Sequence, residues 1–491
     1  MKHYIKISIF GIALILLCSC KDFLATEPYA SISETSAITN YNNAIYALTG
    51  TYNTFQSTGY YGRNFVVIGD ATTNNIIISP NNSNRFIAEA QWSVGPTNGD
   101  MYNLWSDCYQ IIDQSNKILT LIDNIDATDI QKASIKAQAL TIRAMAHFDL
   151  VRIFAQTYKG YESGLGIPYI TKSSTFNKPA RNTIQEVYTF IIQDLTDAIA
   201  NFAIVSGVSG DSFGLSGSGL NENVAAPYFI SSWVAKGILA KVYITQQDYN
   251  SADPILQDII TNSGYTPLTA DKYVDAWSRS YDNAKNVEFM FAIRNLPDDY
   301  NATNCLGYIF LQSGYGDLRA PDSMIDLYSS TDIRREVLFT AGTGTQEGWT
   351  FINKYPGRDG VRALSDTPVL RLSDIYLLYA ETQANLGNTT DAITYLDKIR
   401  QRADASAEAT PSTISQADLI DTILLERRKE LAYEGHYFFD LKRLRMDISS
   451  AYRSDNTMYT TIEFPSYKLA MPIPQDELDA NDNMEPNPIS D

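Results

Sequence analysis

The sequence predicts a mostly α-helical protein, a tetratricopeptide-like scaffold of helical hairpins that carries irregular loops and short strands. Long segments place apolar residues at helical intervals, and 44% of the residues are hydrophobic, enough for a full core. Two blocks also repeat one spacing of small and apolar residues around a central turn. Those residues are Ala240, Ala252, Leu256 and Ile259 in the first block and Ala380, Ala392, Leu396 and Ile399 in the second. Small residues at matched positions let two helices pack closely, as in tetratricopeptide repeats, although two unrelated hairpins could align this well by chance.

The amphipathic segments define the expected helices. Thr183 begins one of them, with Glu186 three residues later in the pattern of a capping box. The segment Ile130–Phe154 is rich in Ala, Leu, Ile and Arg, most of which favour helix. We expect helices over Ala37–Phe55, Tyr102–Ile122, Ile130–Phe154, Thr183–Phe202, Ser231–Gln246, Ala252–Asn262, Ser373–Leu386, Asp391–Ala403 and Gln416–Glu434.

Irregular segments separate these helices, and long ordered loops on a helical scaffold are where binding residues usually lie. Gly59–Gly95 mixes Tyr, Asn and Gly and includes two strand-like runs, Phe65–Ile68 and Ile76–Ile78. The other irregular segments are Gly207–Asn223, Asn295–Leu318 and Ala403–Ser415.

The first twenty residues resemble the leader of a bacterial lipoprotein. Lys2 and Lys6 precede an apolar run over Ile7–Cys18, which has the length of a signal peptide and is too short to span a bilayer. The run leads into Cys20 in a sequence similar to a lipobox, so we expect cleavage before Cys20 and lipidation of its thiol. Each buried CH₂ of an acyl chain contributes about 0.8 kcal/mol, so more than one chain anchors a protein stably. The alternative is an ordinary secretory peptide with an incidental cysteine.

The chain is strongly acidic, with a formal net charge of −18. Such a surface repels phosphate backbones, and the composition therefore argues against a protein that binds nucleic acid. It also argues against attachment to a membrane through basic residues. No other apolar run of the sequence approaches the length of a membrane span, so lipid on Cys20 is the only membrane attachment that we infer.

The sequence contains no familiar catalytic motif. HExxH, CxxC, P-loop and G-x-S-x-G patterns are all missing, and we expect no catalytic residue, metal or cofactor. His147 is expected to be a packing histidine inside a helix, and His436 lies at a helix end. Cys108 and Cys305 could form a disulfide, which only geometry can decide, and we favour two buried, inert thiols.

Abundant carboxylates keep an enzyme open as an alternative. Glu426, Glu430 and Glu434 share one helical face at four-residue spacing. A glycosidase would need a carboxylate pair of defined separation across a sugar. The basic residues at 427–429 predict instead a structural salt-bridge network.

Several segments together resemble one family, the SusD/RagB nutrient-binding lipoproteins of Bacteroidetes outer membranes. The mature start at Cys20–Leu24 with Pro28 is similar to theirs. Two segments are particularly close, RLSDIYLLYAE at 371–381 and ERRKEL through EG to FDLKR at 426–443. The remaining matches lie within Ile135–Arg152, Thr183–Ala198, Met471–Pro474, Asp476–Leu478 and Glu485–Pro488. Because the matches keep one order from residue 20 to nearly 490, the resemblance is specific.

The resemblance implies a mostly helical SusD-like fold with four tetratricopeptide-like helix pairs and a variable loop region. It implies a signal peptide over 1–19 and a SusD-like domain over 20–491, in which an N-terminal part (20–225) and a C-terminal RagB/SusD part (226–491) interleave. It further implies a protein that is not an enzyme, is lipid-anchored in the outer membrane and faces the cell exterior.

The implied role is that of a lid. Such a protein captures an oligosaccharide or polysaccharide and closes over a SusC-like TonB-dependent transporter, which imports the ligand. Two alternatives stay open: a peptide-binding lid of a RagB-like importer, and a surface glycoside hydrolase.

In family members the ligand site lies in the variable loops. Sugar recognition needs flat aromatic faces, together with amides, carboxylates or guanidinium groups for the hydroxyl groups. The candidate ligand-binding residues are Tyr60, Tyr61, Arg63, Asp70, Asn74, Asn75, Trp92, Tyr300, Asn301, Tyr308 and Tyr315, with Asn304 beside them.

Each of these candidates has a structural alternative. The tyrosines could be packing residues of the loops, and Arg63 could brace the fold by pairing with Asp70. Family members often carry a tryptophan where this chain has Ile76–Ile78, which puts a starch-type aromatic arc in doubt. Trp92 and Trp349 lie in loops, and Trp92 is our preferred aromatic platform.

Overall fold

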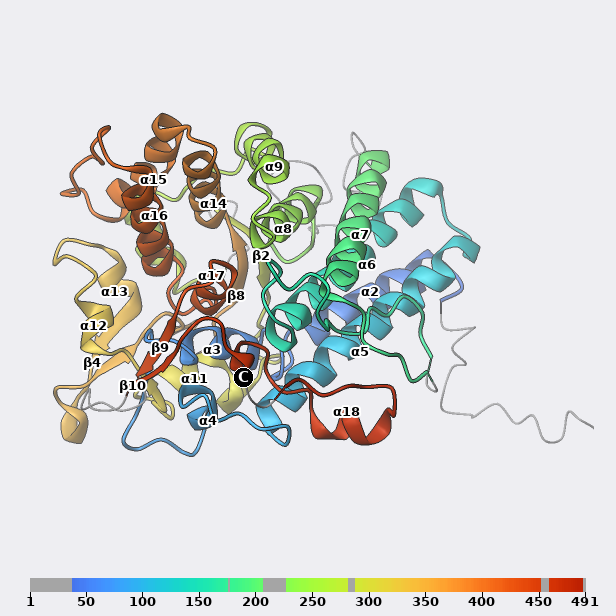
Figure 1. Cartoon of the computed structure of the whole chain (residues 1–491), viewed down its shortest axis with the longest axis horizontal. Helices are drawn as coiled ribbons and strands as arrows, with labels where there is room; N and C mark the ends of the chain where they lie inside the picture. Colours follow the sequence, from blue (N-terminus) through green and yellow to red (C-terminus); the bar gives the residue numbers. More distant parts are fainter. Residues whose placement is uncertain (1–37, 175–176, 206–226, 281–287, 452–458, 489–491) are drawn as a thin grey trace, which may run out of the picture.

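The computed structural model describes residues 38–174, 177–205, 227–280, 288–451 and 459–488, and over them the fold is mostly helical, as predicted. Helices α2, α5, α6 and α7 gather at one end, and α8, α9, α14, α15 and α16 continue from them (Figure 1). Short helices and short strands lie beneath this second group. The leader and Cys20 lie outside the described residues.

The long helices begin and end close to the predicted positions. The Thr183 capping box is confirmed, since Thr183 N donates to Glu186 Oε2 at 2.8 Å and Glu186 N donates to Thr183 Oγ1 at 3.2 Å. The long helices are α2 (Tyr41–Thr54), α5 (Gly99–Leu121), α6 (Asp129–Phe154), α7 (Ile184–Val205), α8 (Ser232–Thr245), α9 (Tyr249–Asn262), α14 (Leu372–Asn385), α15 (Thr389–Ala403) and α16 (Gln416–Glu430).

Helix α16 is shorter than predicted, because the chain turns after Glu430. Tyr433 and Gly435 adopt left-handed conformations, with φ of 63° and 79°. A Cβ on Gly435 would lie 2.8 Å from Val66 Cα, so only glycine lets this turn approach the helix that contains Val66. Glu434 therefore lies in the turn and not on the helical face that the sequence predicted.

The two predicted hairpins are confirmed. Helix α8 packs against α9, and α14 packs against α15, while α14 also contacts α8, α9 and α16. The repeated alanines, leucines and isoleucines of both blocks have no exposed surface. Their small and apolar side chains form the seams between the paired helices, as in a tetratricopeptide arrangement.

The short elements differ from the predictions at one place. The prediction of a strand-like run at Phe65–Ile68 is wrong. These residues lie in helix α3 (Asn64–Ala71), all of whose residues are buried. Burial on every side removes the surface alternation that separates strand from helix in sequence. The other short helices are α4 (Ile87–Ala90), α10 (Ala270–Ala276), α11 (Leu306–Phe310), α12 (Asp322–Ile325), α13 (Arg334–Leu338), α17 (Tyr437–Arg443) and α18 (Gln475–Ala480).

The strands are short and pair antiparallel. One sheet has the order β1-β3-β5-β4, and the predicted run Ile76–Ile78 supplies its β1. Strand β2 pairs with β8, β6 with β7, and β9 with β10. Their bounds are β1 Ile77–Ile78, β2 Phe289–Ile293, β3 Leu318–Arg319, β4 Phe339–Ala341, β5 Thr350–Ile352, β6 Gly357–Arg358, β7 Val361–Arg362, β8 Thr367–Arg371, β9 Ile448–Ala451 and β10 Tyr459–Ile462.

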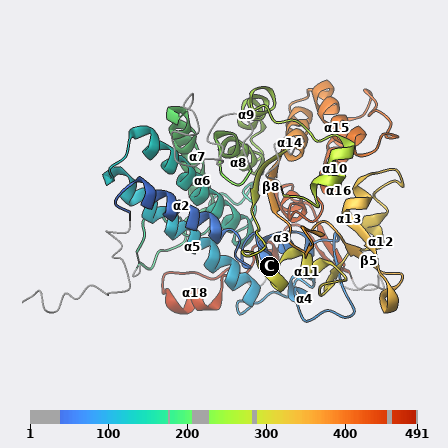
Figure 2. The ribbon, with the colours of Figure 1, turned by 180° about the vertical axis from the view of Figure 1, so that it is seen from behind.

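The C-terminal segment returns to the N-terminal helices. Met471 N donates to Ile153 O at 3.0 Å, and Asn487 Nδ2 donates to Phe154 O at 2.8 Å. Helix α18 lies beside α5 in both views (Figures 1 and 2), where Trp105 Nε1 donates to Glu477 Oε2 at 3.3 Å. These contacts join residues from both ends of the sequence into one structure.

The cysteine and histidine predictions are confirmed. Cys108 and Cys305 are both buried and free. The His147 imidazole stacks on Tyr169 with ring centroids 3.8 Å apart, its Nδ1 lies 2.8 Å from Arg143 O, and its Nε2 accepts from Ile170 N at 3.0 Å. Burial lowers the pKa of His147 to about 3, so the ring is neutral at physiological pH.

The predicted salt-bridge network exists, but most of its partners come from other elements. Arg371, buried at the end of β8, donates to Glu288 Oε1 at 2.7 Å, to Glu430 Oε1 at 3.0 Å and to both carboxylate oxygens of Glu434. Glu426 accepts from Arg334 at 2.6 Å and lies 3.9 Å from Lys429, one of the basic residues on which the prediction of a network rested.

The charges of this network stabilise one another. Burial opposes ionisation of Glu430, but the guanidinium groups of Arg402, Arg371 and Arg334 outweigh that effect and hold the pKa of this carboxyl well below its usual range. Lys354 Nζ completes the cluster with a hydrogen bond to Glu434 Oε1 at 2.8 Å. A buried ion cluster of this kind depends on every partner being present.

Replacing Arg371 with methionine tests this dependence. The R371M variant leaves Glu288 and Glu434 with fewer cationic partners in the core, and its free energy of unfolding should fall by about 3–5 kcal/mol in urea titrations. Arg279 is an exposed residue that pairs with Asp275. The R279M control should stay within about 0.5 kcal/mol of the wild type. Equal effects of the two substitutions would contradict the role of the cluster.

Candidate ligand-binding site

The two loop regions that the sequence analysis selected meet in the structure. Ile77 of β1 is the register partner of Arg319 of β3, and Ser79 N donates to Asp317 O at 2.9 Å. A second junction joins Asn301 Nδ2 to Gln56 O at 2.6 Å. Residues more than 200 positions apart in the sequence thus lie side by side at these two junctions.

Asp317 holds the two regions together. Its buried carboxylate accepts from Ser83 N and Ser83 Oγ, both at 2.7 Å, and from Arg85 Nη1 at 3.3 Å. A carboxylate with several donors of this kind is a strong tether. The loop after β1 is therefore fixed against the segment that precedes β3.

Arg85, Tyr308 and Tyr315 form an aromatic and cationic surface at this junction. The rings of Tyr308 and Tyr315 lie 5.9 Å apart and are tilted by 58°, and Arg85 Cζ lies 4.0 Å from the centroid of the Tyr315 ring. Tyr315 is 38% exposed. A backbone bond from Tyr315 N to Tyr308 O at 2.7 Å fixes the pair, and a Cβ on Gly314 would lie 2.5 Å from Tyr308 O, so this loop requires glycine there.

Tyr300 belongs to the same loop region. Tyr300 and Tyr308 pack against a small hydrophobic cluster of Cys305, Leu311 and Ala363 that is separate from the main core. Asn304 is exposed next to this cluster. Of the predicted site residues, the structure thus brings Tyr300, Asn301, Tyr308 and Tyr315 together at the surface. We name the surface of Arg85, Tyr300, Asn304, Tyr308 and Tyr315 the tyrosine surface.

The predicted residues before β1 lie in the interior. Tyr60 and Tyr61 are buried, and their hydroxyl groups donate to Asp149 Oδ2 at 2.6 and 3.0 Å. Arg63 does brace the fold, but its partner is Asp100, at 3.2 Å, and not Asp70. These side chains support the loops, and a ligand contact from them stays a prediction.

Asp70, Asn74 and Asn75 are held by α16 and by the turn that follows it. Asp70 accepts from Asn75 Nδ2 at 2.7 Å and from Gly435 N at 2.9 Å. Arg428 donates to Asn75 Oδ1 and to Asn74 Oδ1, both at 2.8 Å. Burial raises the pKa of Asp70 to about 6. The predicted amide and carboxylate groups therefore have partners within the protein.

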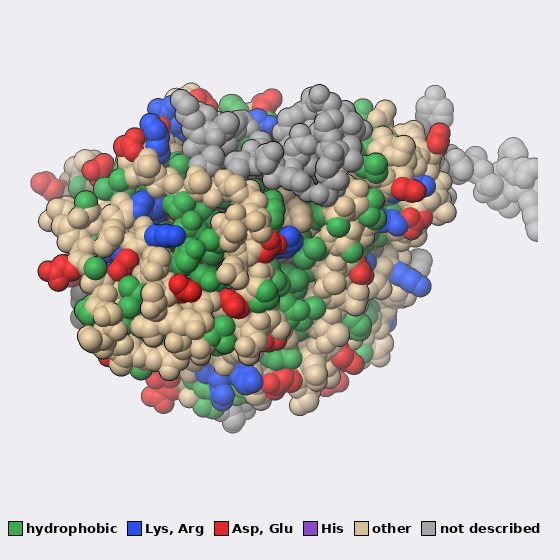
Figure 3. Space-filling view, turned by 90° about the horizontal axis from the view of Figure 1, so that it is seen from above, with side chains coloured by type: hydrophobic (Ala, Val, Ile, Leu, Met, Phe, Trp, Pro, Cys, Tyr) green, Lys and Arg blue, Asp and Glu red, His purple; other side chains and the backbone are tan. Residues whose placement is uncertain are grey.

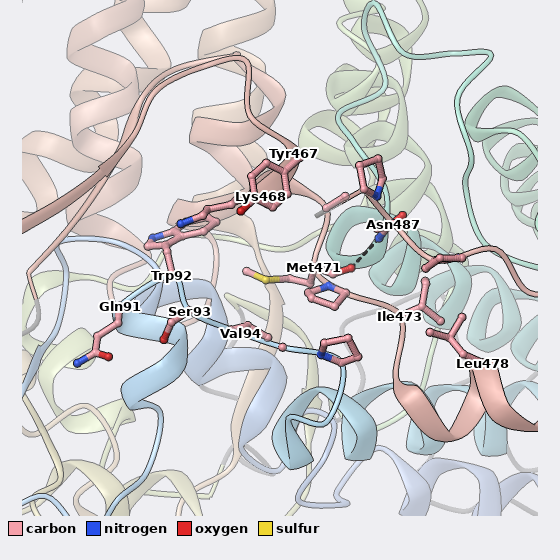
Figure 4. Close-up of a pocket in the computed structure, with 16 residues that line it drawn as sticks. Gln91, Trp92, Ser93, Val94, Tyr467, Lys468, Met471, Ile473, Leu478 and Asn487 are labelled. Carbon is pink, nitrogen blue, oxygen red and sulfur yellow. Dashed lines mark hydrogen bonds between the residues drawn. The ribbon is translucent and has the colours of Figure 1, made fainter. Parts of the chain in front are cut away.

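Trp92, the preferred platform, is 4% exposed. Its Nε1 donates to Thr72 O at 3.0 Å, and its ring packs against Phe438. One edge lines a cavity of about 410 Å³ between residues 91–96 and the C-terminal segment, together with Val94, Met471 and Leu478 (Figure 4). Neither Tyr308 nor Tyr315 lines this cavity. Stacking of a sugar on Trp92 stays a prediction.

Arg85 is the residue of the tyrosine surface that the sequence analysis missed. It follows a run of asparagine and serine residues, a composition typical of turns, and nothing in its spacing points to Tyr315, 230 positions later. A basic residue in the irregular segment between the expected helices was the only available signal.

No group of three or more His, Cys, Asp or Glu residues that could hold a metal occurs among the residues that the structure describes. On the face shown in Figure 3, acidic and basic side chains are interspersed and hydrophobic side chains gather between them. In the described parts of the chain, no helix combines the length and the hydropathy of a membrane span.

Comparison with known proteins gives the family. Residues 340–489 match the SusD family, and residues 22–206 match a family described as starch-binding and associating with the outer membrane. A solved Bacteroides vulgatus structure, described as a sugar binding protein, is 30% identical and superposes with a TM-score of 0.81 over 93% of this chain and 100% of that one. This chain belongs to the SusD family.

Other SusD relatives extend over nearly the whole sequence. SusD-like protein P38 of Formosa agariphila is 24% identical, over 90% of this chain and 92% of that protein. The fold is shared with surface glycan-binding protein A of Bacteroides thetaiotaomicron, solved in complex with laminarihexaose, at 19% identity and a TM-score of 0.71 over 91% of this chain and 100% of that one. The SusD-like helical scaffold predicted from the sequence is confirmed.

Glu89, next to the Trp92 loop, gives the region a measurable pH dependence. Burial raises the pKa of Glu89 to about 7, although Asn98 Nδ2 donates to it at 2.8 Å. The folded state holds this proton more tightly than the unfolded state, so its contribution to stability is complete below about pH 4.5 and is lost as the pH rises towards 7.

The E89Q variant removes this titration. Between pH 4.5 and 8 the free energy of unfolding of the wild type should fall by about 1–3 kcal/mol relative to E89Q, since one pKa unit corresponds to about 1.4 kcal/mol. Urea denaturation at the two pH values measures the difference. A difference between the two proteins that does not change with pH would contradict the raised pKa.

Proposed function

We propose that this SusD family protein captures an oligosaccharide or polysaccharide at the tyrosine surface. The observation that carries the proposal is the pair of the half-buried Tyr308 and the exposed Tyr315, with the Arg85 guanidinium stacked on the second ring. Tyrosine rings offer flat faces to the C–H groups of a sugar, and the guanidinium and the Asn304 amide offer hydrogen bonds to its hydroxyl groups. The sugar-binding description of the Bacteroides vulgatus relative supports this assignment.

A binding role fits the chain better than hydrolysis. The three carboxylates weighed for a hydrolase in the sequence analysis, Glu426, Glu430 and Glu434, are buried and accept hydrogen bonds from arginine or lysine. A general acid must hold its proton near neutral pH, whereas the arginines around Glu430 keep its pKa low. We therefore propose that the protein is not an enzyme.

We extend the proposal to the placement and partner of the protein. A lipid on Cys20 would anchor the domain over 20–491 in the outer membrane, facing the exterior, after removal of the leader over 1–19. The bound glycan would then be delivered to a SusC-like TonB-dependent transporter, over which the protein acts as a lid. The lipobox-like sequence and the family described as associating with the outer membrane support this part.

The Y315A variant tests glycan capture. In affinity electrophoresis and calorimetry against a panel of neutral and acidic glycans, the wild type should bind at least one glycan, and Y315A should bind it about five- to thirtyfold more weakly. The loss of one stacking aromatic ring, worth about 1–2 kcal/mol, accounts for that factor. Tyr46, which is 71% exposed on α2, provides the Y46A control, and its affinity should equal that of the wild type.

Other outcomes decide between the alternatives. A folded wild-type protein that binds no glycan of the panel, but releases peptides on mass spectrometry of the purified protein, would replace glycan capture with peptide capture. Release of new reducing ends from a glycan would contradict the non-enzymatic role.

The C20S variant tests the anchor and the partner together. Full-length wild-type protein, isolated from cells fed an alkyne-labelled fatty acid, should carry the label, fractionate with the outer membrane and co-purify with a TonB-dependent transporter. C20S should lack the label and leave the membrane fraction, because its acyl chains are missing. An unlabelled, freely diffusing wild-type protein would overturn the anchor.

A further inference from the structure

Arg319 of β3 is a buried cation that has no hydrogen-bond acceptor for its Nε and Nη2 among the described residues. The residue is 3% exposed. Burial lowers the pKa of Arg319 to about 10, an effect that the charge of Asp322 only partly offsets. Buried polar groups are almost always hydrogen-bonded in native proteins, and an orphaned guanidinium therefore needs an explanation.

Other buried arginines of this chain show what Arg319 lacks. Arg143 donates to both carboxylate oxygens of Asp194 at 2.6 and 2.7 Å, and Arg334 and Arg371 each meet several carboxylates. The planar guanidinium fork matches the two oxygens of a carboxylate or the oxygens of a sulfate group. In the described parts of the chain Arg319 therefore lacks a hydrogen-bond acceptor, and its positive charge favours an anionic acceptor, although Arg181 shows that backbone carbonyl oxygens can also satisfy a buried guanidinium.

The nearest carboxylate along the strand is already occupied. Asp317 lies two residues before Arg319, and alternate residues of an extended strand lie on the same side. The Asp317 carboxylate, however, accepts from Ser83 and Arg85. It therefore binds the loop after β1 and leaves the guanidinium of Arg319 without an anion.

Trp349 covers the guanidinium. Arg319 Cζ lies 4.3 Å from the centroid of the Trp349 ring, and Trp349 is itself half-buried. A cation stacked on an indole ring gains electrostatic stabilisation but no hydrogen bond. The Trp349 ring thus occupies one face of the Arg319 guanidinium, where a hydrogen-bond acceptor could take its place.

The loop that carries Trp349 is open around two glycines, while the backbone of Trp349 itself is hydrogen-bonded to Gly342 and Gln346. Gly344 and Gly348 adopt left-handed conformations, with φ of 62° and 84°, and no heavy atom lies within 4 Å of where their Cβ atoms would be. The other end of the loop is fixed next to the tyrosine surface by two hydrogen bonds between Thr343 and Gln312. Thr343 N donates to Gln312 Oε1 at 3.0 Å, and Gln312 Nε2 donates to Thr343 O at 2.8 Å. Trp349 therefore borders the loop that carries Tyr308 and Tyr315.

We propose that Arg319 recognises the acidic group of a negatively charged glycan, a uronate carboxylate or a sulfate, when Trp349 moves off its guanidinium. The inference rests on the proposed function and specifies the ligand class of the same site. The sugar rings of such a ligand would lie on the tyrosine surface, with the acidic group on Arg319. The negative charge of the whole protein opposes distant anions, but at physiological salt this repulsion is screened within about 8 Å.

The R319M variant tests the proposal in the full-length protein. Calorimetry compares three six-residue probes: an oligogalacturonate for the carboxylate, a carrageenan oligosaccharide for the sulfate, and neutral laminarihexaose. The wild type should bind one of the acidic probes, and R319M should bind that probe at least tenfold more weakly. For any neutral glycan that the wild type binds, the affinity of R319M should stay within twofold of the wild-type affinity. R319K, which keeps the charge but not the fork, should bind the acidic probe with intermediate affinity. The R279M control should bind like the wild type.

Movement of Trp349 has its own readout. Tryptophan emission of the wild type should change when the acidic probe binds, and this change should be missing in W349F. R319M removes a buried charge that has no acceptor for its Nε and Nη2 among the described residues, so its Tm should be at least that of the wild type. If R319M does not fold, the comparison of R319K with the wild type still tests the contact, and equal affinities would overturn it.

Failure of this inference is distinguishable from failure of the proposed function. A wild type that binds neutral glycans of the panel but neither acidic probe overturns the role of Arg319 and leaves glycan capture intact. An equal loss of neutral and acidic binding in R319M also overturns it, because the residue would then only support the fold. A folded wild type that binds no glycan overturns both.

Discussion

Arg371 stands where strand β8 becomes helix α14, and its guanidinium meets carboxylates from two widely separated parts of the chain. Glu288 precedes β2, Glu430 ends α16, and Glu434 lies in the following turn. The one cation therefore fixes a strand pair, a helical hairpin and a turn relative to one another. Each of these charges is buried, so none can be removed without leaving another uncompensated in the core.

The turn that contains Glu434 connects this ion cluster to the loops around β1. Gly435 N donates to Asp70, and Asp70 in turn holds Asn75, next to the beginning of β1. Strand β1 then pairs with β3, from which Asp317 binds Ser83 and Arg85. Hydrogen bonds, short stretches of chain and the contact of Arg85 with Tyr315 thus connect the buried ion cluster to the tyrosine surface. Several residues that the sequence suggested for ligand contact, such as Asp70 and Asn75, are members of this series.

The helical scaffold was predictable because its signals are local. Amphipathic spacing gave the positions of the long helices. The Thr183 capping box located the beginning of helix α7 to within one residue. The repeated alanines gave the two hairpins, since close helix packing requires small side chains wherever it occurs. The errors lie where local signals are missing: in α3, which is buried on all sides, and after Glu430, where a left-handed turn ends the helix.

The site was only half predictable, because its geometry joins residues far apart in the sequence. Tyrosine-rich and asparagine-rich loops at 59–95 and 295–318 were visible from composition, and the likeness to the SusD family pointed to both. Which tyrosines face inward was not visible, since Tyr60 and Tyr315 have the same chemistry and differ only in whether Asp149 or solvent lies beside them. The partners of Arg85 and the isolation of Arg319 depend on the pairing of β1 with β3.

By itself, the sequence determined the helical class, the hairpin seams, the absence of familiar catalytic motifs and the SusD family, because each depends on spacing or composition along the chain. Only the tertiary structure decided which charges pair, which aromatic rings are exposed and which arginine lacks an acceptor. Those properties depend on side chains that approach through space, and a buried polar group is stable or costly according to neighbours that no local pattern specifies.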